Sequence, residues 1–501
     1  MVSSPTEHSP LLQKQSIPSG CCGANNGTGG CCSTSSAHPS STSNGDNDVI
    51  SCQLSDQSWQ AKSIALMCAL LLAVGSHFAA HTLGAMKNTI KEVRIRDHKL
   101  TVWRATIVSG HCQHHPPGNV LVALSTHSAN WNIMIVGRVL YGVGSGSVVI
   151  VQETILSQWF RGRSLAAVVA LMLTVSRLAS FLAQATVIPI SNWSGWYGYG
   201  FWFSALLCFF SLVINLVYIV LLRKVFPVSD VDQCRSIQTI KRKKAFKWSK
   251  LLFLPHAYWL IVSMEFLLGG GWGCFLHINS ELVKLRFGYN NSDAAATASV
   301  AQVLPIFFMP LLGVLVDKYG KRPLMMVCSG VTFSLAMYLL EYTNLNPLVG
   351  MLSFSLSLAL GPVGLVSSVP VLLPLSLVGT GLGLVKCATN IGASLFDIVT
   401  GWLQDQDANK GYTGVMIFFI VLGALSILSG IVLWILDYQI YDNLLDQSAV
   451  LAQRREKMDT SYKKHDAMEE RPLKMNYFYG AILLGLMVNS WGLFIRFIIH
   501  Q

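Results

Sequence analysis

The chain has 501 residues, of which 52% are hydrophobic and only 12% are charged. Soluble proteins carry about 25% charged residues, so this composition excludes an ordinary soluble protein and predicts an all-α polytopic membrane protein. The formal net charge of +11 needs no nucleic-acid partner, because the positive-inside rule places basic residues in cytoplasmic loops.

Residues 1–60 are rich in Ser, Gly, Asn and Thr and lack apolar periodicity, which predicts a disordered cytoplasmic tail. Within this tail, EHSPLL resembles an acidic dileucine sorting signal, in which Glu7 precedes the pair Leu11 and Leu12. Adaptor proteins read such a signal and send membrane proteins to lysosomes or vacuoles. A chance match is the alternative.

The first apolar span is predicted at 63–83. Residues 85–130 then contain no uninterrupted apolar run of about 20 residues, the length that a spanning helix needs. Only 119–125 reads as the end of a span. The HCQHHPP stretch inside this segment lacks the spacing of a standard zinc-ligand set, so no metal site is predicted.

Apolar runs of spanning length resume at Asn132. The predicted spans are 132–155, 164–188, 201–222, 257–278, 296–316, 323–341, 348–370, 378–402 and 413–436, followed by a last span at 477–499.

Two polar, basic segments divide these spans, and both are predicted to be cytoplasmic. The domain organisation that follows is an N-terminal helical bundle at 61–222, a linker at 223–256, a C-terminal helical bundle at 257–437, a cytoplasmic segment at 438–476 and an extra transmembrane helix at 477–499.

Two independent signals give the same orientation in the membrane. Arg161, Arg163 and the linker 223–256 fall on one side by the alternation of spans. The sequons at Asn192 and Asn290 fall on the other side, where glycosylation acceptors must face the lumen.

Ionisable side chains inside a span are costly, so each is a candidate for a functional site. In the first bundle these candidates are Arg138, Glu153 with the neighbouring Gln152, and Arg177. Arg177 has two interpretations: a salt-bridged structural residue, or a cation that faces a central cavity and binds a substrate carboxylate through a bidentate contact.

The second bundle carries a similar set, with Glu265 in the middle of its span and Gln302 in the next one. Lys386, Asn390 and Asp397 share one face of a later helix, because they are one and about three turns apart. These charges either pack as a pair between helices or line the cavity and bind opposite ends of a zwitterion.

The sequence GVLVDKYGKRPL, residues 313–324, lies between two spans and predicts a tight cytoplasmic turn. Its first glycine would allow two helices to approach closely, and its aspartate would cap or pair with a neighbouring helix end. The predicted gating residues are Gly313, Asp317, Lys318, Gly320, Lys321 and Arg322.

The pattern G-x-L-x-D-x-x-G-x-R of this turn resembles the loop signature of the major facilitator superfamily. Residues 137–163, VSRLAS at 175–180 and TNIG at 389–392 are similar to its lysosomal dipeptide transporter branch. The resemblance implies two six-helix bundles and alternating access. It also implies uniport of dipeptides out of lysosomes without an enzymatic step or a cofactor, with a homodimer or a glycosylated lysosomal protein as a partner.

The resemblance also implies roles for single residues. Arg177 matches the arginine of the fifth helix that is proposed to hold the substrate. Where this branch tends to carry an acid, the chain has Gly146, and Glu153 is the substitute on the same face. The predicted substrate-binding residues are Arg177, Glu153, Gln152, Lys386, Asn390, Glu265 and Gln302, and the predicted structural or coupling residues are Arg138 and Asp397.

The signature occurs once, although the superfamily carries it in each half. The second helix of the first bundle and most of the third are therefore predicted to be missing. A bundle of four helices would leave the transport path open to lipid, so the chain as written is predicted to fold poorly or not to transport. The extra span at 477–499 has no assigned purpose beyond anchoring or packing.

The leading functional prediction is a carrier for a small organic solute, with substrate, membrane lipid and sorting adaptors as partners and no nucleic acid. A sugar or drug carrier of the same superfamily is one alternative. A non-transporting membrane receptor or scaffold is the other. Proton-coupled and facilitated transport both fit the intramembrane charges.

Overall fold

The protein is described from a computed structural model, in which α-helices form nearly all of the described structure and no strand occurs among the described residues. The described residues are 59–82, 86, 116–128, 131–160, 165–225, 254–373, 375–407, 411–448, 451 and 475–499. Several predicted features lie outside the described residues. They are the sorting signal at Glu7, Leu11 and Leu12, most of 85–115, most of the linker and most of 438–476.

Ten helices among the described residues are long and apolar enough to cross a membrane. They are Lys62–Thr82, Leu165–Ser194, Gly198–Tyr218, His256–Phe287, Asn291–Tyr319, Arg322–Tyr342, Pro347–Leu372, Leu377–Gln406, Thr413–Ile440 and Met475–Arg496. The predicted all-α polytopic membrane protein is confirmed.

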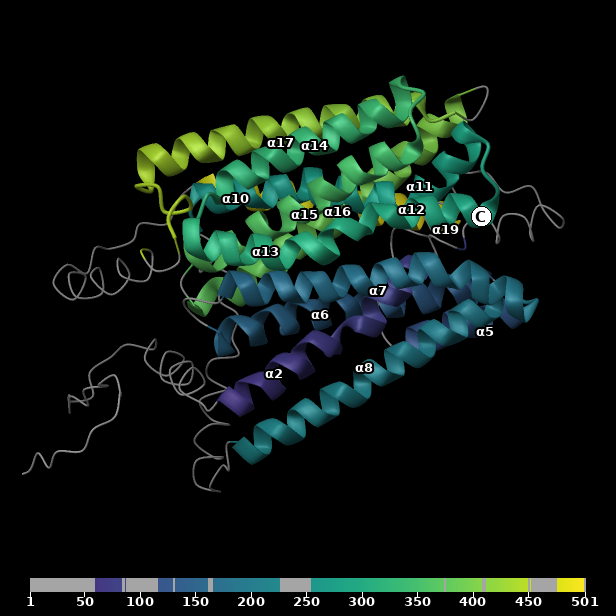
Figure 1. Ribbon diagram of the computed structural model, residues 1–501, viewed down its shortest axis with the longest axis horizontal. Coiled ribbons are helices and arrows are strands. Elements are labelled where there is room, and N and C mark those ends of the chain that lie inside the picture. The colour runs from purple at the N-terminus through teal and green to yellow at the C-terminus, as the bar shows by residue number, and fades with distance from the viewer. Residues whose placement is uncertain are drawn as a thin grey trace, which may run out of the picture. The chain divides into compact units, whose positions relative to one another are not determined.

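The first bundle contains helices of unequal length (Figure 1). They are α2 (Trp59–Leu72, continued by the rest of the first span), α5 (Pro116–Ser128), α6 (Trp131–Trp159), α7 (Leu165–Ser194) and α8 (Gly198–Val225). The 13 residues of α5 extend about 20 Å at about 1.5 Å per residue, less than the roughly 30 Å hydrocarbon core. This short helix corresponds to the predicted end of a span at 119–125.

Small residues and buried hydrogen bonds hold α5 in the bundle. A Cβ added to Gly118 would lie 2.7 Å from the carbonyl oxygen of Gly137, so α5 and α6 are in backbone contact. The Asn119 amide donates to Ser204 Oγ of α8 at 2.8 Å. Contacts of this kind drive helix association in lipid, where the hydrophobic effect is absent.

The second bundle follows from residue 254 (Figure 1). Its elements are α10 (His256–Met264), the π-helical turn η2 (Glu265–Gly269), α11 (Gly270–Phe287), α12 (Asn291–Ser299), the 3₁₀ turn η3 (Val300–Gln302), α13 (Val303–Tyr319), α14 (Arg322–Tyr342), α15 (Pro347–Leu372), α16 (Leu375–Gln406) and α17 (Thr413–Ile440), and the chain continues to α19 (Met475–Ile499).

The span predicted at 257–278 is shorter than the helix that the structure contains. The sequence pattern predicts its end at residue 278, whereas α11 continues to Phe287 and ends at Gly288, whose φ of 71° is left-handed. The added turns carry polar residues that other elements satisfy. The Asn279 amide, for example, donates to the carbonyl of Ala298 at 3.2 Å, so polarity in this segment does not mark the end of the helix.

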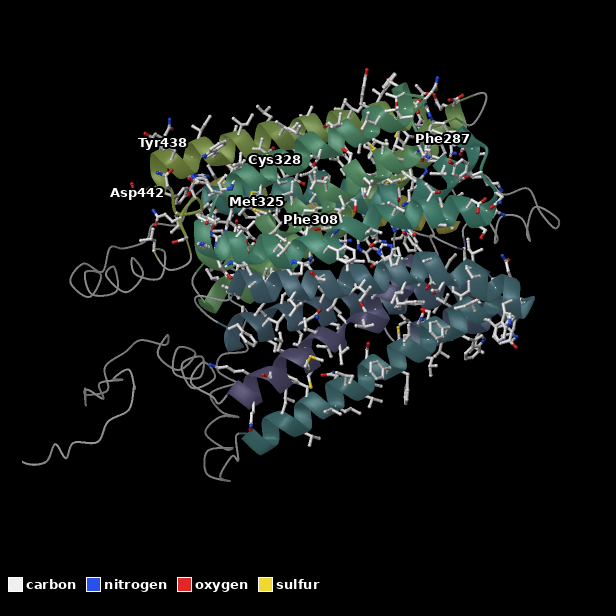
Figure 2. The ribbon with its side chains drawn as sticks, in the orientation of Figure 1. Phe287, Phe308, Met325, Cys328, Tyr438 and Asp442 are labelled. Atoms are coloured by element: carbon white, nitrogen blue, oxygen red, sulfur yellow. The ribbon has the colours of Figure 1, made fainter. Side chains whose placement is uncertain are left out.

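Aromatic side chains fill the second bundle, and apolar side chains cover its outer faces. Phe275, Phe333 and Phe354 are fully buried, and Phe354 contacts both other rings, with Phe275 and Phe354 at a centroid distance of 4.5 Å. Phe308 of α13 and Cys328 of α14 are exposed instead (Figure 2). Exposed apolar side chains along the outer helices are expected where lipid is the solvent.

The two bundles meet along α7 and α13, which lie side by side (Figure 1). Gly313 makes this close packing possible. A Cβ at this position would lie 2.5 Å from Ala170 Cβ and 2.8 Å from the carbonyl oxygen of Ala166. The predicted close approach of two helices at Gly313 is therefore found between the bundles.

Replacing Gly313 with Ala is expected to lower the melting temperature of the detergent-solubilised protein, because the added methyl group must separate α7 from α13. Overpacking of this kind costs about 1–3 kcal/mol. The matched control is Gly485→Ala on α19, where a Cβ meets no atom within 4 Å. There the higher helix propensity of alanine should leave the melting temperature unchanged or raise it. Equal effects of the two substitutions would contradict the packing argument.

Candidate functional site

A cavity of about 390 Å³ lies between the helices of the two bundles. Its walls come from the end of the first span and from α6, α7, the η2–α11 region, α15, α16 and α19. Most of its lining is apolar, with a set of polar side chains among it. These polar residues include His77, His81, Arg177, Glu265, His277, Lys386, Thr389, Asn390, Ser394 and Ser490.

An ion pair joins the bundles beside this cavity. Lys386 Nζ of α16 lies 3.3 Å from Glu153 Oε1 of α6. The Glu153 side chain is only 1% exposed, whereas that of Lys386 is 23% exposed. The carboxylate is thus held inside the protein, and the ammonium group lies at the cavity surface, where a second anion can reach it.

Glu265 lies at the start of a π-helical turn, a rare element that is frequent at functional sites. Its Oε2 accepts a hydrogen bond from Thr389 Oγ1 of α16 at 2.9 Å. The backbones behind this contact are close, because a Cβ at Gly270 would lie 2.8 Å from the carbonyl carbon of Gly392. In the TNIG segment, the threonine therefore orients a carboxylate and the glycine lets α16 approach α11.

Arg177 reaches the cavity from α7, opposite the second bundle. Its Nε has no hydrogen-bond partner among the described residues. A guanidinium with unused donors in a cavity can bind a carboxylate through two parallel hydrogen bonds.

His277 and Asp397 form a buried pair between α11 and α16, with 3.1 Å between Nδ1 and Oδ2. Asp397 is fully buried, and the His277 ring lines the cavity. The aspartate therefore orients the histidine and does not line the cavity itself. Asn390, on the same helix, is exposed and lines it.

Two predicted substrate-binding residues bond elsewhere. The buried Gln152 amide donates to the carbonyl of Ala69 at 2.7 Å and so links α6 to α2. The Gln302 amide donates to Gln184 Oε1 at 3.2 Å and so links the second bundle to α7. Neither lines the cavity, and Glu153, which pairs with Lys386, does not line it either. Arg138 is buried in α6, with its guanidinium carbon 5.5 Å from the ring centroid of Tyr141.

The turn after α13 joins the bundles at the ends of the helices that are predicted to be cytoplasmic. Asp317 accepts hydrogen bonds from the backbone N–H groups of Ala166 at 3.2 Å and Ala167 at 2.9 Å. These groups belong to the first turn of α7, where N–H groups lack partners in the helix and the helix dipole favours an anion. Asp317 thus caps a helix of the opposite bundle.

Three other residues of this turn, Gly320, Lys321 and Arg322, contact the segment after α17. Gly320 and Lys321 have left-handed φ values of 77° and 58°, and a Cβ on Gly320 would collide with carbonyl groups of that segment. Lys321 pairs with Asp446. Arg322 is buried and donates to the carbonyl of Leu445 at 3.3 Å. Lys318 is exposed, 5.0 Å from the ring centroid of Tyr319.

Both predicted glycosylation sites are exposed. Asn192 lies in the last turn of α7, the end opposite to that capped by Asp317. Asn290 precedes α12, and its side chain accepts a hydrogen bond from the backbone N–H of Asp293. Because α12 and α13 together form one span, Asn290 also lies at the end opposite to Asp317. This placement agrees with the predicted orientation.

The sequence interpretation missed two histidines that line the cavity. His77 and His81 are one helical turn apart in the first span, and His77 Nε2 and His81 Nδ1 are buried without a hydrogen-bond partner among the described residues. The available signal was the spacing of two ionisable side chains by four residues inside an apolar run.

Comparisons with known proteins agree with this architecture. A sequence profile described as Major Facilitator Superfamily matches residues 261–500. The lysosomal dipeptide transporter MFSD1 of Bos taurus is 27% identical over 364 residues, which cover 69% of this chain and 73% of that protein. These residues are therefore similar to a dipeptide transporter.

Two solved transporters share the fold. The proton:xylose symporter XylE superposes with a TM-score of 0.56 at 14% identity, covering 75% of this chain and 95% of its own. The peptide transporter POT in complex with sulfate superposes with a TM-score of 0.53 at 12% identity, covering 80% and 99%.

Lys386→Met is expected to lower the melting temperature strongly, because it leaves the buried Glu153 carboxylate without its cation. Removing one partner of a buried ion pair costs about 3–5 kcal/mol. The double variant Glu153→Gln/Lys386→Met removes both charges and should recover most of the loss. If the double variant is as unstable as the single one, the unpaired charge of Glu153 is not the cause of the lower melting temperature. Uptake by a stable double variant then distinguishes a packing pair from a pair that transport requires.

Asp317→Ala is expected to weaken the cytoplasmic contact between α7 and α13. Losing a helix cap costs about 0.5–2 kcal/mol, which changes the population of open cytoplasmic ends about two- to thirtyfold. The readout is the modification rate of Val366→Cys, which lines the cavity from α15, by an impermeant thiol reagent in inside-out vesicles. Asp293→Asn, at the opposite end of the membrane, is the control. An unchanged rate with Asp317→Ala would show that this cap does not close the cytoplasmic side.

Proposed function

We propose that the chain is a member of the major facilitator superfamily, a family of membrane transporters, and that it carries dipeptides across a lysosomal or vacuolar membrane by alternating access. The single observation that carries this proposal is a cavity between the bundles that presents charges of both signs. Arg177 comes from the first bundle, and Glu265 and Lys386 come from the second.

A dipeptide matches this arrangement because it carries an ammonium group and a carboxylate at opposite ends. The free donor of Arg177 suits the carboxylate, and Lys386 adds a second positive charge at the cavity surface. Glu265, held by Thr389, suits the ammonium group. A neutral sugar would leave these charged groups desolvated without compensation, which disfavours the sugar alternative.

The size of the cavity supports a small solute. About 390 Å³ lies near the lower end of the roughly 300–1,000 Å³ that small-molecule sites occupy. An apolar lining with a few placed polar groups is also typical of such sites, because the polar groups fix orientation while the apolar surface accepts varied side chains.

Alternating access requires contacts between the bundles that can form and break at either end. At the cytoplasmic end, Asp317 caps α7. Toward the other end, Gln184 of α7 bonds with Gln302 and with the carbonyl of Leu276. Rocking of one bundle against the other would exchange these two sets.

The proposed compartment rests on the name of the relative and on the tail motif formed by Glu7, Leu11 and Leu12. Sorting adaptors, an accessory lysosomal glycoprotein and a homodimer are proposed partners on the same basis. Glu153, Glu265 and Asp397 are the carboxylates that would carry protons if transport is coupled.

Arg177→Ala is expected to abolish dipeptide uptake into proteoliposomes, because the substrate carboxylate loses its bidentate partner. Arg177→Lys keeps the charge without the fork geometry and should retain part of the uptake. The matched control is Arg286→Ala, which removes an arginine that pairs with Glu341 outside the cavity. Unaffected uptake by Arg177→Ala would remove this residue from the site.

The same assay separates the alternative functions. Alanyl-alanine, free alanine and glucose are offered to the purified protein in parallel. Uptake of glucose in preference to the dipeptide would identify a sugar carrier. Absence of flux with all three solutes, in a protein that is folded by its melting curve, would favour a receptor or scaffold and would agree with the prediction that the shortened first bundle does not transport.

A further inference from the structure

The last helix, α19, has one protein-facing side and one lipid-facing side. Asn476, Ser490 and Phe494 are 3%, 5% and 4% exposed, and their spacings of 14 and 4 residues place them on one helical face. On the other face, Val488 and Ile495 are 61% and 50% exposed. Trp491, which is 48% exposed, lies at the edge between the two faces and borders the cavity. The helix is therefore docked in one rotational setting.

Side-chain hydrogen bonds fix the beginning of α19 to the second bundle. Trp259 Nε1 donates to Asn476 Oδ1 at 2.9 Å, and the Asn476 amide donates to the carbonyl of Leu254 at 2.9 Å. The Tyr479 ring packs against Trp259 with a centroid distance of 5.5 Å. An asparagine that uses both its donor and its acceptor in a buried site specifies position as well as contact.

The end of α19 contacts the transport cavity and the first bundle. Ser490, Trp491 and Phe494 line the cavity, with Trp491 edge-on to Phe494 at a centroid distance of 5.9 Å. Phe494 also belongs to a buried cluster with Phe78 and Val122 of the first bundle. The match with the superfamily profile runs to residue 500 and so includes this helix.

The charged lining of the cavity explains why a wall is needed here. The cavity presents charged side chains of both signs, Arg177, Glu265 and Lys386. Charged side chains that line the cavity must be shielded from lipid, because each costs several kcal/mol in contact with hydrocarbon. A helix packed against α16 at the cavity edge supplies such shielding.

We propose that α19 forms one wall of the substrate cavity, and that Trp491 contacts the side chain of the transported substrate. That the molecule in the cavity is a transported substrate rests on the proposed function. The placement of α19 rests only on the contacts of this helix. An aromatic ring at this position offers an apolar surface to a peptide side chain while the charged groups hold the termini.

The placement is tested by thiol accessibility in the full-length protein, without any need for transport. Trp491→Cys and Val488→Cys are compared in sealed vesicles with a charged, impermeant methanethiosulfonate reagent, and the rate of the parent protein is subtracted. Modification requires a thiolate in water, so Trp491→Cys should react about tenfold faster than Val488→Cys, which faces lipid. Equal rates, or no reaction of Trp491→Cys above the parent, would overturn the proposal.

The contact with substrate is tested by selectivity. Trp491→Ala should raise the KM for phenylalanyl-alanine about three- to tenfold, the loss expected for one aromatic contact, while the KM for alanyl-alanine stays unchanged. Ile495→Ala, on the lipid-facing side, is the matched control. An equal rise for both dipeptides would contradict a side-chain contact. If the protein carries no dipeptide and Trp491→Cys still reacts faster than Val488→Cys, the proposed substrate fails and the wall stands.

Discussion

The ion pair between Glu153 and Lys386 sets the main constraint on this protein. Both side chains lie at membrane depth, where an unpaired charge is costly, and they come from α6 and α16 of different bundles. The pair therefore ties the bundles together beside the cavity. It also leaves the lysine partly exposed to that cavity, so a contact that stabilises the structure keeps a cation available to a ligand. Structural and binding roles for such charges are compatible in this geometry.

A second contact between the bundles acts at the first turn of α7 and has different chemistry. Asp317 replaces water at the first N–H groups of α7, and Gly313 removes the side chain that would keep the helices apart. A helix cap is worth about 0.5–2 kcal/mol, which is small enough to break during each transport cycle. The pair of Glu153 and Lys386 thus holds α6 against α16 beside the cavity, whereas the Asp317 cap on α7 can open.

The sequence predicted those features that depend on local chemistry. Asp317 in a glycine-bounded turn and Arg177 and Lys386 inside apolar runs were visible because polarity in such places is rare. The roles of Gln152 and Gln302 were not visible, because a polar side chain inside a span reads the same whether it faces a cavity or a neighbouring carbonyl. His77 and His81 were missed because a histidine inside an apolar run is a weaker signal of function than an arginine or a lysine. Tertiary packing decides whether such a side chain faces the cavity or a neighbouring helix, and the pattern of residues along the chain does not show that packing.

The position of α19 has a consequence for how the cavity is assembled. Its wall residues Ser490, Trp491 and Phe494 follow all other lining residues in the chain, and Phe494 packs on helices from the first bundle. Both bundles must therefore be in place before this helix can bury its face. The contacts of Asn476 with Trp259 and Leu254 position the helix start on the second bundle, independently of the first. The last helix can then dock by its beginning and close the cavity with its end, which couples completion of the substrate site to assembly of the two bundles.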